Sequence, residues 1–343
     1  MKKIIVLLLC VMAYSTSFAQ TDEKKAGFQL SFVPPLSTNG AEASQYTNMF
    51  SINILAGVSK NEETCTLGGL SNFILNNSKG LQMAGLSNYV GNDGLGLQMA
   101  GLININMKNF TGFQMGGLVN TAAEMNGIQY AGLLNNAQNM GGLQFSGLVN
   151  IAKNVNGLQF AGLLNIAKEV EGMQIAGLVN IADKSDYPIG VVNIIKEGEM
   201  GVAVTYDALG STVATFRSGG KCTYGFIGIG YNHKTENSAW VSEGGIGLHA
   251  PITSWFRLNN ELKAGTIGCD EDDPVLYAGY SLLPSFKLGK HFEVFGGVNI
   301  NYMYTEDVSN CEIFPEHSIW DKVEATKLQQ VFFGYQVGLQ YNF

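Results

Sequence analysis

The sequence predicts an all-β protein in two parts, a solenoid-like array of short repeats followed by a small antiparallel β-barrel of the transmembrane type. Three observations lead to this prediction. A glutamine recurs at positions 82, 98, 114, 129, 144, 159 and 174, inside one repeated phrase. Longer segments of alternating apolar and polar residues follow from about Met200. The composition, with 43 glycines, 7 prolines and little helical periodicity, is typical of β-structure.

The first 19 residues have the features of a secretory signal peptide. Lys2 and Lys3 precede an apolar run that begins at Ile4, and small residues lead to Ala19, where we expect cleavage. No later stretch reaches the ~18–20 uninterrupted apolar residues that a transmembrane helix needs. We therefore expect an exported protein that meets a membrane, if at all, through β-structure.

Charge and cysteine content exclude several classes of function. Removal of residues 1–19, which hold two lysines and no acidic residue, changes the net charge from −8 to −10. An acidic chain without a basic cluster argues against nucleic acid and anionic lipid as partners. The remaining cysteines form no CxxC pair that would support a zinc or redox site, and their disulfide state stays open: Cys65, Cys222, Cys269 and Cys311.

The repeated phrase reads G-[LIMF]-Q-[MFYI]-[AGS]-G-L-x-N, and its clearest copy runs from Gly157 to Ala167. It fits either a solenoid, with one coil per repeat, or an up-and-down sheet, with one strand and a turn per repeat. A solenoid must bend within the phrase, because about five residues cannot return the ~33 Å that a straight ten-residue strand spans. The Ala161-Gly162 pair is the expected corner, since glycine tolerates positive φ and close backbone approach.

The residues between the phrases favour the solenoid. Five of the six linkers carry an apolar residue at the same place, which the third side of a coil would bury and an exposed turn would not: Phe110, Met125, Met140, Val155 and Val170. The first linker has Gly94 there instead. The alternative, one continuous antiparallel barrel or sheet that includes the repeats, rests on the alternation of Leu158 and Phe160 with Gln159 and Ala161.

The repeats must fold as a set. One coil is expected to bury about four large side chains at ~1.5–3 kcal/mol each, against ~1–2 kcal/mol of backbone entropy for each ordered residue. Stacking supplies the shared core and inter-coil hydrogen bonds that a single coil lacks. The recurring Gln and Asn residues are then expected to form amide ladders from coil to coil, which gives them a structural role and not a ligand-binding one.

The segment from Met200 to Phe343 has the pattern of transmembrane strands. Tyr335, Val337 and Leu339 alternate with polar or small residues, and the strand that begins at Phe292 alternates in the same way. Counted backward, long and short connections also alternate: Thr305–Leu328, Gly289–Lys290, Ile267–Pro274, Pro251–Ser254, His233–Ser238 and Ser218–Lys221. About eight strands fit, to which Phe28–Val33 and Phe50–Ala56 could add two. A barrel of this size is filled by its own side chains.

Two resemblances add to these patterns. The end of the chain, Tyr341-Asn342-Phe343, resembles the last strand of bacterial outer-membrane β-barrel proteins, which implies recognition by the barrel-assembly machinery and contact with outer-membrane lipid. The array from about residue 50 to 195, with its closing phrase Pro188–Val192, resembles a family of exported bacterial surface-repeat proteins. That resemblance implies an outer-membrane-associated protein and places the repeats on the cell surface. It implies no activity.

We divide the chain into four parts: the signal peptide (1–19), N-terminal strands that could join the barrel (20–58), the repeat array (59–195) and the barrel-like domain (196–343). The side of the membrane on which the array lies stays open, because strand parity places it in the periplasm and the surface-repeat resemblance places it outside. The oligomeric state stays open as well.

No cluster of residues selects a reaction. The four histidines have neither metal-ligand spacing nor the partners of a nucleophilic triad: His233, His249, His291 and His317. The acidic run Cys269–Asp273 lacks the spaced ligands of a calcium loop. We predict a structural or interaction protein of the outer membrane, with no catalytic, cofactor-binding or metal-binding residue and with an unidentified protein or glycan partner. The alternative is a small barrel enzyme or narrow channel. A lumen filled by residues such as Gln336, Asn299 and Arg257 would favour the first.

Overall fold

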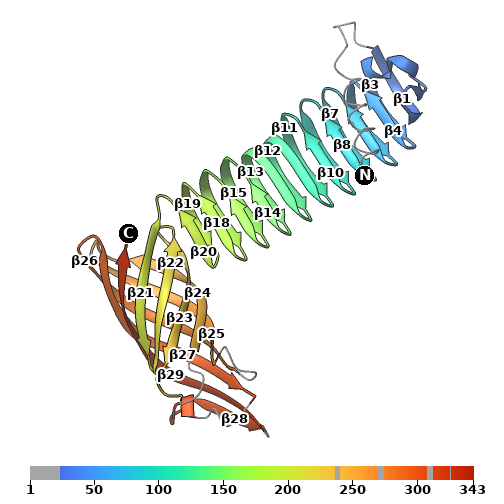
Figure 1. The fold of residues 1–343 in the computed structure, drawn as a ribbon. Coiled ribbons are helices and arrows are strands. Elements are labelled where there is room, and N and C mark those ends of the chain that lie inside the picture. The colour runs from blue at the N-terminus through green and yellow to red at the C-terminus, as the bar shows by residue number, and fades with distance from the viewer. Residues whose placement is uncertain (1–23, 236–239, 269–273, 307–311, 325) are drawn as a thin grey trace. The chain divides into compact units, whose positions relative to one another are not determined.

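The structure is a computed structural model that describes residues 24–235, 240–268, 274–306, 312–324 and 326–343. The expected signal peptide and the acidic run Cys269–Asp273 lie outside the described residues. The chain is almost entirely β, with a solenoid of about 10 turns and a closed barrel of eight antiparallel strands (Figure 1), as the sequence predicts. It divides into two compact units, Met1–Lys153 and Asn154–Phe343. In its described part, the first unit holds coils and their N-terminal element, and the second holds the remaining coils and the barrel.

Each turn of the solenoid has three sides. One set of strands runs from the third side of one coil into the first side of the next. This set comprises β5 (Asn61–Gly68), β7 (Ser78–Ala84), β9 (Gly94–Ala100), β11 (Asn109–Gly116), β15 (Asn154–Ala161), β17 (Glu169–Ala176) and β19 (Lys184–Ile189). The second side is formed by β4 (Ala56–Ser59), β6 (Ser71–Ile74), β8 (Ser87–Val90), β10 (Ile103–Asn106), β14 (Val149–Ile151), β16 (Leu164–Ile166), β18 (Val179–Ala182) and β20 (Val192–Ile195). Two longer strands, β12 (Val119–Ala131) and β13 (Leu134–Ser146), continue from one coil into the next.

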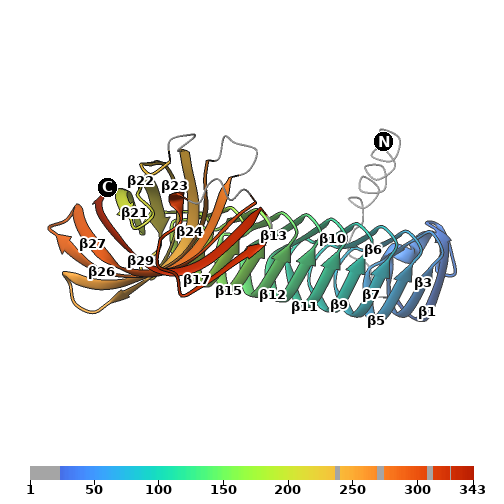
Figure 2. The ribbon, with the colours of Figure 1, turned by 90° about the horizontal axis from the view of Figure 1, so that it is seen from below.

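Neighbouring coils pair in parallel and in register, so that each residue lies beside its counterpart. Figure 2 shows the first-side strands β5, β7, β9 and β11 side by side. Gln114 of β11, for example, pairs with Gln129 of β12, and Asn104 of β10 pairs with Asn120. The prediction of a solenoid over the strand-and-turn alternative is therefore confirmed.

The corner predicted at the Ala-Gly pair is also confirmed. Of the two expected reasons for glycine there, close backbone approach applies and positive φ does not. A Cβ added to Gly132 would lie 2.2 Å from the carbonyl oxygen of Gly117 in the preceding coil. Close backbone approach therefore requires glycine there. Positive φ occurs instead at the glycine that opens the phrase, with φ 132° at Gly127.

The interior of the coils differs from our expectation of four large buried side chains. In the coil that begins at Gly157, the inward residues are Gln159, Ala161, Asn165, Ala167 and Val170. The larger apolar residues point outward, with Phe160 44% exposed and Leu163 43% exposed. Packing inside is therefore done by two amides, two alanines and the apolar linker residue. The predicted burial of the linker residues is confirmed, since Phe110, Met125, Met140, Val155 and Val170 are all at most 3% exposed.

The N-terminal segments belong to the solenoid and do not add to the barrel. β1 (Lys24–Val33) pairs in parallel with β3 (Tyr46–Asn53), and β3 pairs in parallel with β5. The alternative in which Phe28–Val33 and Phe50–Ala56 extend the barrel is therefore wrong. The short β2 (Leu36–Ser37) and the 3-10 helix η1 (Gly40–Gln45) lie between them. This terminal element protects the end coil, as capping units do in other repeat proteins.

The barrel comprises β21 (Glu199–Asp207), β22 (Ser211–Gly219), β23 (Thr223–Asn232), β24 (Trp240–Pro251), β25 (Phe256–Ile267), β26 (Val275–Leu288), β27 (Phe292–Thr305) and β29 (Lys327–Asn342). β21 pairs antiparallel with β29 and closes the ring. A further strand, β28 (Trp320–Glu324), extends β29 as a hairpin. Side chains alternate as predicted: Tyr335 and Val337 are about half exposed on the outer wall, whereas Gln336 is 1% exposed inside.

The two rims of the barrel differ. Because the number of strands is even, the start of β21 and the end of β29 lie at one rim, where Gly201 pairs with Asn342. The connections at this rim are short, at 220–222, 252–255 and 289–291. Three of the four connections at the opposite rim are longer, at 233–239, 268–274 and 306–326, which matches the predicted alternation. Among the described residues, no helix has the length and hydropathy needed to cross a membrane.

Candidate functional surfaces in the barrel and the solenoid

The middle of the barrel interior is filled by one ion pair and its aromatic neighbours. The Arg217 guanidinium donates to Glu261 at 2.6 Å, and both side chains are at most 3% exposed. The Tyr224 hydroxyl donates to the same carboxylate at 2.6 Å. The guanidinium carbon also lies 4.6 Å from the centre of the Phe295 ring and 5.3 Å from that of Phe226. A buried charge needs such pairing to offset its lost hydration.

Two further networks occupy the lumen on either side of this pair. Towards the rim with short turns, the Arg257 guanidinium contacts Glu293 and Glu199, with a distance of 2.7 Å from Nε to Glu293 Oε1. On the other side, the Lys263 ammonium donates to Glu243 at 3.2 Å and lies 3.6 Å from Asp207. The three cations Arg217, Arg257 and Lys263 are thus all paired with carboxylates. The lumen is filled by these three cations and the five carboxylates that hold them.

An apolar layer closes the barrel near the rim with long loops. It consists of Leu209, Val213, Val241, Ile267, Val275, Tyr277, Met303, Ile313, Phe314 and Phe332. Ile313 and Phe314 come from the long connection between β27 and β29, and both are buried. The three residues that we expected to fill the lumen are confirmed there, with Gln336, Asn299 and Arg257 at most 4% exposed.

Three of the four histidines have separate hydrogen-bond partners. His249 lies inside the barrel, where its ring stacks on Tyr224 at 4.1 Å and its Nδ1 lies 2.8 Å from Asn259 Oδ1. The nearby Ser285 hydroxyl donates to Glu293, and neither side chain is accessible. His233 contacts Thr212 of β22, and His291 contacts the backbone of Asn342 of β29.

Cysteines and metals give no site among the described residues. Cys65 and Cys222 are free thiols, whereas Cys269 and Cys311 lie outside the described residues. No group of three or more His, Cys, Asp or Glu side chains that could hold a metal ion occurs in the described ranges.

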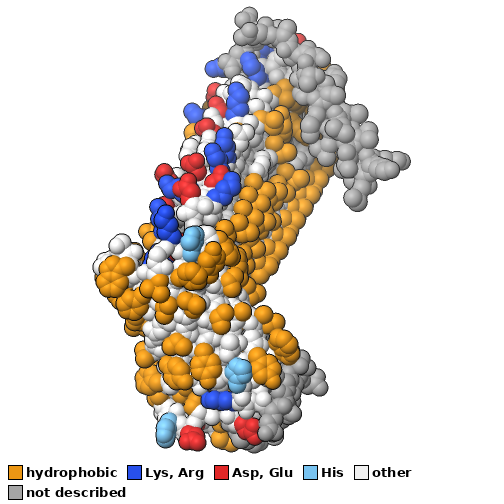
Figure 3. Space-filling model, turned by 60° about the vertical axis from the view of Figure 1, so that its left-hand side comes forward, with side chains coloured by type: hydrophobic (Ala, Val, Ile, Leu, Met, Phe, Trp, Pro, Cys, Tyr) orange, Lys and Arg blue, Asp and Glu red, His pale blue; other side chains and the backbone are white. Residues whose placement is uncertain are grey.

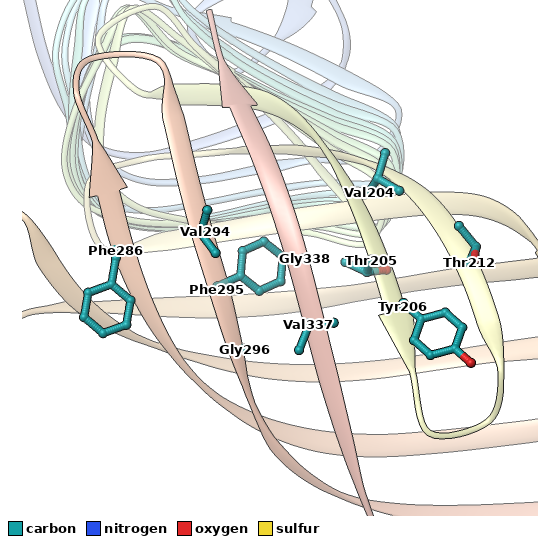
Figure 4. Close-up of a pocket in the computed structure, with 10 residues that line it drawn as sticks. All are labelled: Val204, Thr205, Tyr206, Thr212, Phe286, Val294, Phe295, Gly296, Val337 and Gly338. Carbon is teal, nitrogen blue, oxygen red and sulfur yellow. The ribbon is translucent and has the colours of Figure 1, made fainter.

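The outer wall of the barrel carries an apolar depression of about 480 Å³ (Figure 4). It lies mainly over β21, β27 and β29, and Gly296, which pairs with Val337, places no side chain in it. Its lining is almost entirely apolar and includes no ionisable group other than the Tyr206 phenol. The depression has no chemistry for catalysis. It is part of the apolar outer wall.

The solenoid interior carries the two amide ladders that the repeat predicts. In the glutamine ladder, Gln114 donates to Gln98 at 2.7 Å and Gln129 donates to Gln114 at 2.8 Å. In the asparagine ladder, Asn104 donates to Asn120 and Asn120 to Asn135, at 2.9 and 3.0 Å. The two ladders therefore run in opposite directions. Each of these amides is fully buried, and the asparagines also donate to a backbone carbonyl, as Asn120 does to Tyr130.

The first coils have a more polar interior. The position occupied by Met125 and Met140 in later coils is occupied by Asn48, Glu62 and Ser78 here. The Ser51 hydroxyl donates to Glu62 at 2.7 Å and the Asn48 amide donates at 3.2 Å. Burial raises the pKa of the Glu62 carboxyl to about 7. At neutral pH this group is therefore close to its titration midpoint inside the solenoid.

The outer surface of the solenoid is apolar on two of its three sides. At the corner between the first and second sides, one leucine per coil is 38–52% exposed: Leu70, Leu86, Leu102, Leu118, Leu133 and Leu148 in the first unit, and Leu163 and Leu178 in the second. We call these residues the corner leucines. On either side of them the outward positions are also mostly apolar, such as Phe113 and Met115 on the first side and Ile103 and Ile105 on the second.

Charged residues are confined to the third side. From Lys79 to Lys184 they lie in the linkers, as Lys108, Glu124 and Lys168 do, and not in the outward positions of the first two sides. Figure 3 shows this separation, with hydrophobic side chains gathered on one side of the repeat region and charged side chains along the neighbouring edge. We call the first and second sides the apolar faces. They form the candidate binding surface that sequence reasoning did not identify as a site.

The last coil packs on the outer wall of the barrel. The Asn193 backbone N–H donates to the Ser218 hydroxyl at 2.9 Å, and the Thr223 hydroxyl donates to the Pro188 carbonyl at 2.7 Å. Ser218 and Thr223 adjoin Arg217 and Tyr224, which point into the lumen, so they point outward and are covered by the coil. Comparisons with family models, with curated proteins and with solved structures find no match to this chain.

Proposed function

We propose that this chain is a structural or interaction protein of the bacterial outer membrane, anchored by its barrel and displaying its solenoid on the periplasmic side. The observation that carries the proposal is the polarity of the barrel wall, apolar outside and charge-paired inside. This is the arrangement that lipid requires of a spanning β-structure. In water the same outer wall would be an exposed apolar surface far larger than monomeric proteins tolerate.

The side of the solenoid follows from the rims. In outer-membrane barrels the short turns face the periplasm and the long loops face outward. The solenoid enters β21 at the rim with short turns, which also carries the end of β29. This geometry favours the periplasmic side over the cell surface that the surface-repeat resemblance implies. Recognition of β29 by the barrel-assembly machinery belongs to the same proposal.

The filled lumen supports an anchor and not a channel or barrel enzyme. Conduction needs a continuous water path, whereas here Arg217, Arg257 and Lys263 are each held by carboxylates and an apolar layer lies beyond them. Catalysis needs an accessible nucleophile or acid–base pair, whereas Ser285 and His249 are both buried.

The test is a planar-bilayer recording of the purified full chain, after heat-modifiable gel migration has shown that the barrel is folded. We expect no discrete conductance steps. Steps whose ion selectivity changes in an Arg257→Gln variant would show that the lumen is a pore and would overturn the anchor role. Recovery of the folded chain in the soluble periplasmic fraction would overturn the membrane location.

A further inference from the structure

The apolar faces of the solenoid pose a question that an anchor role does not answer. Stacked strands are ~4.8 Å apart and five residues of strand span ~16 Å, so the six corner leucines of the first unit and the two faces beside them cover on the order of 800 Å². Monomeric soluble proteins rarely leave a few hundred Å² of contiguous apolar surface exposed. A partner that buries both faces is therefore required.

The faces have the chemistry of a lipid-contacting surface. Their backbone groups are used in the parallel pairing between coils, for example from β9 through β11 to β12. Most of their polar side chains are turned inward, where Gln98 and Gln114 bond to each other, and the outward Asn136 donates to Thr121 of the neighbouring coil. A surface can enter hydrocarbon only when its backbone and amide groups are satisfied internally. The barrel wall obeys the same rule, with apolar residues outside and polar residues inside.

Within the second unit, the contact between the last coil and the barrel puts that coil beside the outer wall, near the rim with short turns. Ser218, Thr223 and Gly225 belong to the outer wall of β22 and β23, near the rim with short turns. A Cβ added to Gly225 would lie 1.9 Å from the Gly190 carbonyl oxygen, so the coil touches the wall itself. Within this unit the apolar faces continue to Leu178 and Ile194, which are 52% and 43% exposed. The faces thus begin where the lipid-facing wall ends.

The shape of the surface selects the occupant. The two faces meet at the convex ridge of corner leucines, so a flat protein surface could cover only one face at a time. Fluid acyl chains conform to such a wedge. The outward positions of the faces also lack charged groups and offer few hydrogen-bonding groups with which a specific protein partner could be selected.

Resting on the proposed outer-membrane anchor, we propose that the corner leucines of the solenoid insert among the acyl chains of periplasmic-leaflet lipid, with the charged third side in water. This is the arrangement of an interfacial amphipathic element, which buries its apolar face about 5–10 Å deep. The solenoid thereby holds a strip of the inner leaflet, and its third side is the surface that remains available to periplasmic partners.

The test places an environment-sensitive fluorophore on single cysteines in the full chain, after Cys65, Cys222, Cys269 and Cys311 are replaced by serine. Leu133→Cys puts it on the ridge, and Glu124→Cys puts it on the third side that directly precedes this coil. Val298→Cys, on the outer wall of β27 and 63% exposed, reports barrel insertion. The chain is reconstituted in phosphatidylcholine vesicles with or without brominated acyl chains.

We expect brominated lipid to reduce the emission at positions 133 and 298 by about half or more, and to leave the emission at position 124 nearly unchanged. Quenching at 298 without quenching at 133 would overturn the inference and leave the anchor intact. Quenching at neither would overturn both. Equal quenching at 133 and 124 would contradict the orientation.

A second copy of the chain as the occupant is distinguished by a pyrene label at position 133. Contact between copies would give excimer emission that disappears when unlabelled chain is added in excess, and this result would overturn the lipid assignment. We expect monomer emission only.

Discussion

The Asn193 side-chain amide donates to the Ser218 carbonyl at 3.2 Å, so the asparagine ladder of the solenoid ends on the barrel wall. The same side chain accepts from Asn180 of the preceding coil at 2.8 Å. A buried amide with a partner above and below has no unsatisfied group. The barrel strand β22 therefore serves as the C-terminal cap of the solenoid, as Asn39 does at the other end by donating to Gln29 and Asn48.

Breaking the asparagine ladder in the middle should destabilise the solenoid. Asn120→Leu removes an acceptor from the fully buried Asn104, and it removes a donor from the fully buried Asn135 and from the Tyr130 carbonyl. We expect a loss of about 2–4 kcal/mol in the free energy of unfolding, because each orphaned buried group costs ~1–3 kcal/mol. The control is Asn136→Leu, an exposed position of the next coil. Equal urea midpoints for the two variants would contradict the role of the ladder.

The corner glycines should tolerate no side chain. Gly132→Ala puts a Cβ against the Gly117 carbonyl oxygen, and the backbone must shift to relieve the overlap. Gly27→Ala meets no atom within 4 Å and is the matched control. We expect the Gly132 variant to expose several neighbouring coils to limited proteolysis, because coils share their core. Cleavage patterns identical to those of the control would show that the corner has room.

Removing one partner of the central ion pair should weaken the barrel more than removing both. Arg217→Met leaves the Glu261 carboxylate buried and uncompensated, which costs about 3–5 kcal/mol. Replacing both residues by methionine removes the charge as well, and we expect most of the loss to be recovered. The temperature at which the folded band is lost on a gel measures the effect. A double variant less stable than Arg217→Met would contradict the account.

The Glu62 carboxyl should make the first coils more stable at acidic pH. Its pKa is about 7 in the folded chain and about 4.5 when it is exposed, so between these values the folded state binds a proton that the unfolded state has lost. The stability that this proton contributes, about 3 kcal/mol, is present below pH 4.5 and is lost as pH rises through 7.

The matched variant is Glu62→Gln, which keeps the shape and removes the titration. We expect the stability of the wild type to fall relative to that of the variant between pH 4.5 and 8, with urea midpoints of the solenoid transition as the measurement. Parallel pH profiles for the two proteins would contradict the raised pKa.

The repeat period was enough to predict the solenoid, because in-register stacking follows from a constant interval between like residues. The buried linker residues such as Phe110 and Val155 identified the third side. The alternation of Tyr335 and Gln336 predicted the barrel wall, and loop lengths predicted its rims. The sequence could not show whether Phe28–Val33 belongs to the solenoid or to the barrel, because a short alternating strand has the same pattern whether its neighbour pairs in parallel or antiparallel.

The sequence did not reveal the apolar faces of the solenoid as a candidate surface, because the pattern left the direction of the side chains undecided. Leu158 and Phe160 alternate with Gln159 and Ala161, and period alone does not say which set points inward. We expected the larger apolar residues inside, as in soluble solenoids. The inward set is the amide set, because an amide in one coil bonds to its counterpart in the next, as Gln129 does to Gln114. The alternation of apolar and polar residues in the repeat therefore indicated correctly that one set of side chains faces outward and is apolar. The up-and-down sheet that it also suggested was wrong.

The most direct test of the proposed topology is cysteine labelling of cells with a reagent that does not cross membranes. Single cysteines at Ser318, in the long connection before β29, and at Lys153, on the third side of a coil, are introduced in the cysteine-free background. We expect Ser318→Cys to be labelled on intact cells and Lys153→Cys only after the outer membrane is permeabilised. Labelling of Lys153→Cys on intact cells, or protection of Ser318→Cys in a chain shown to be inserted, would contradict the periplasmic placement of the solenoid.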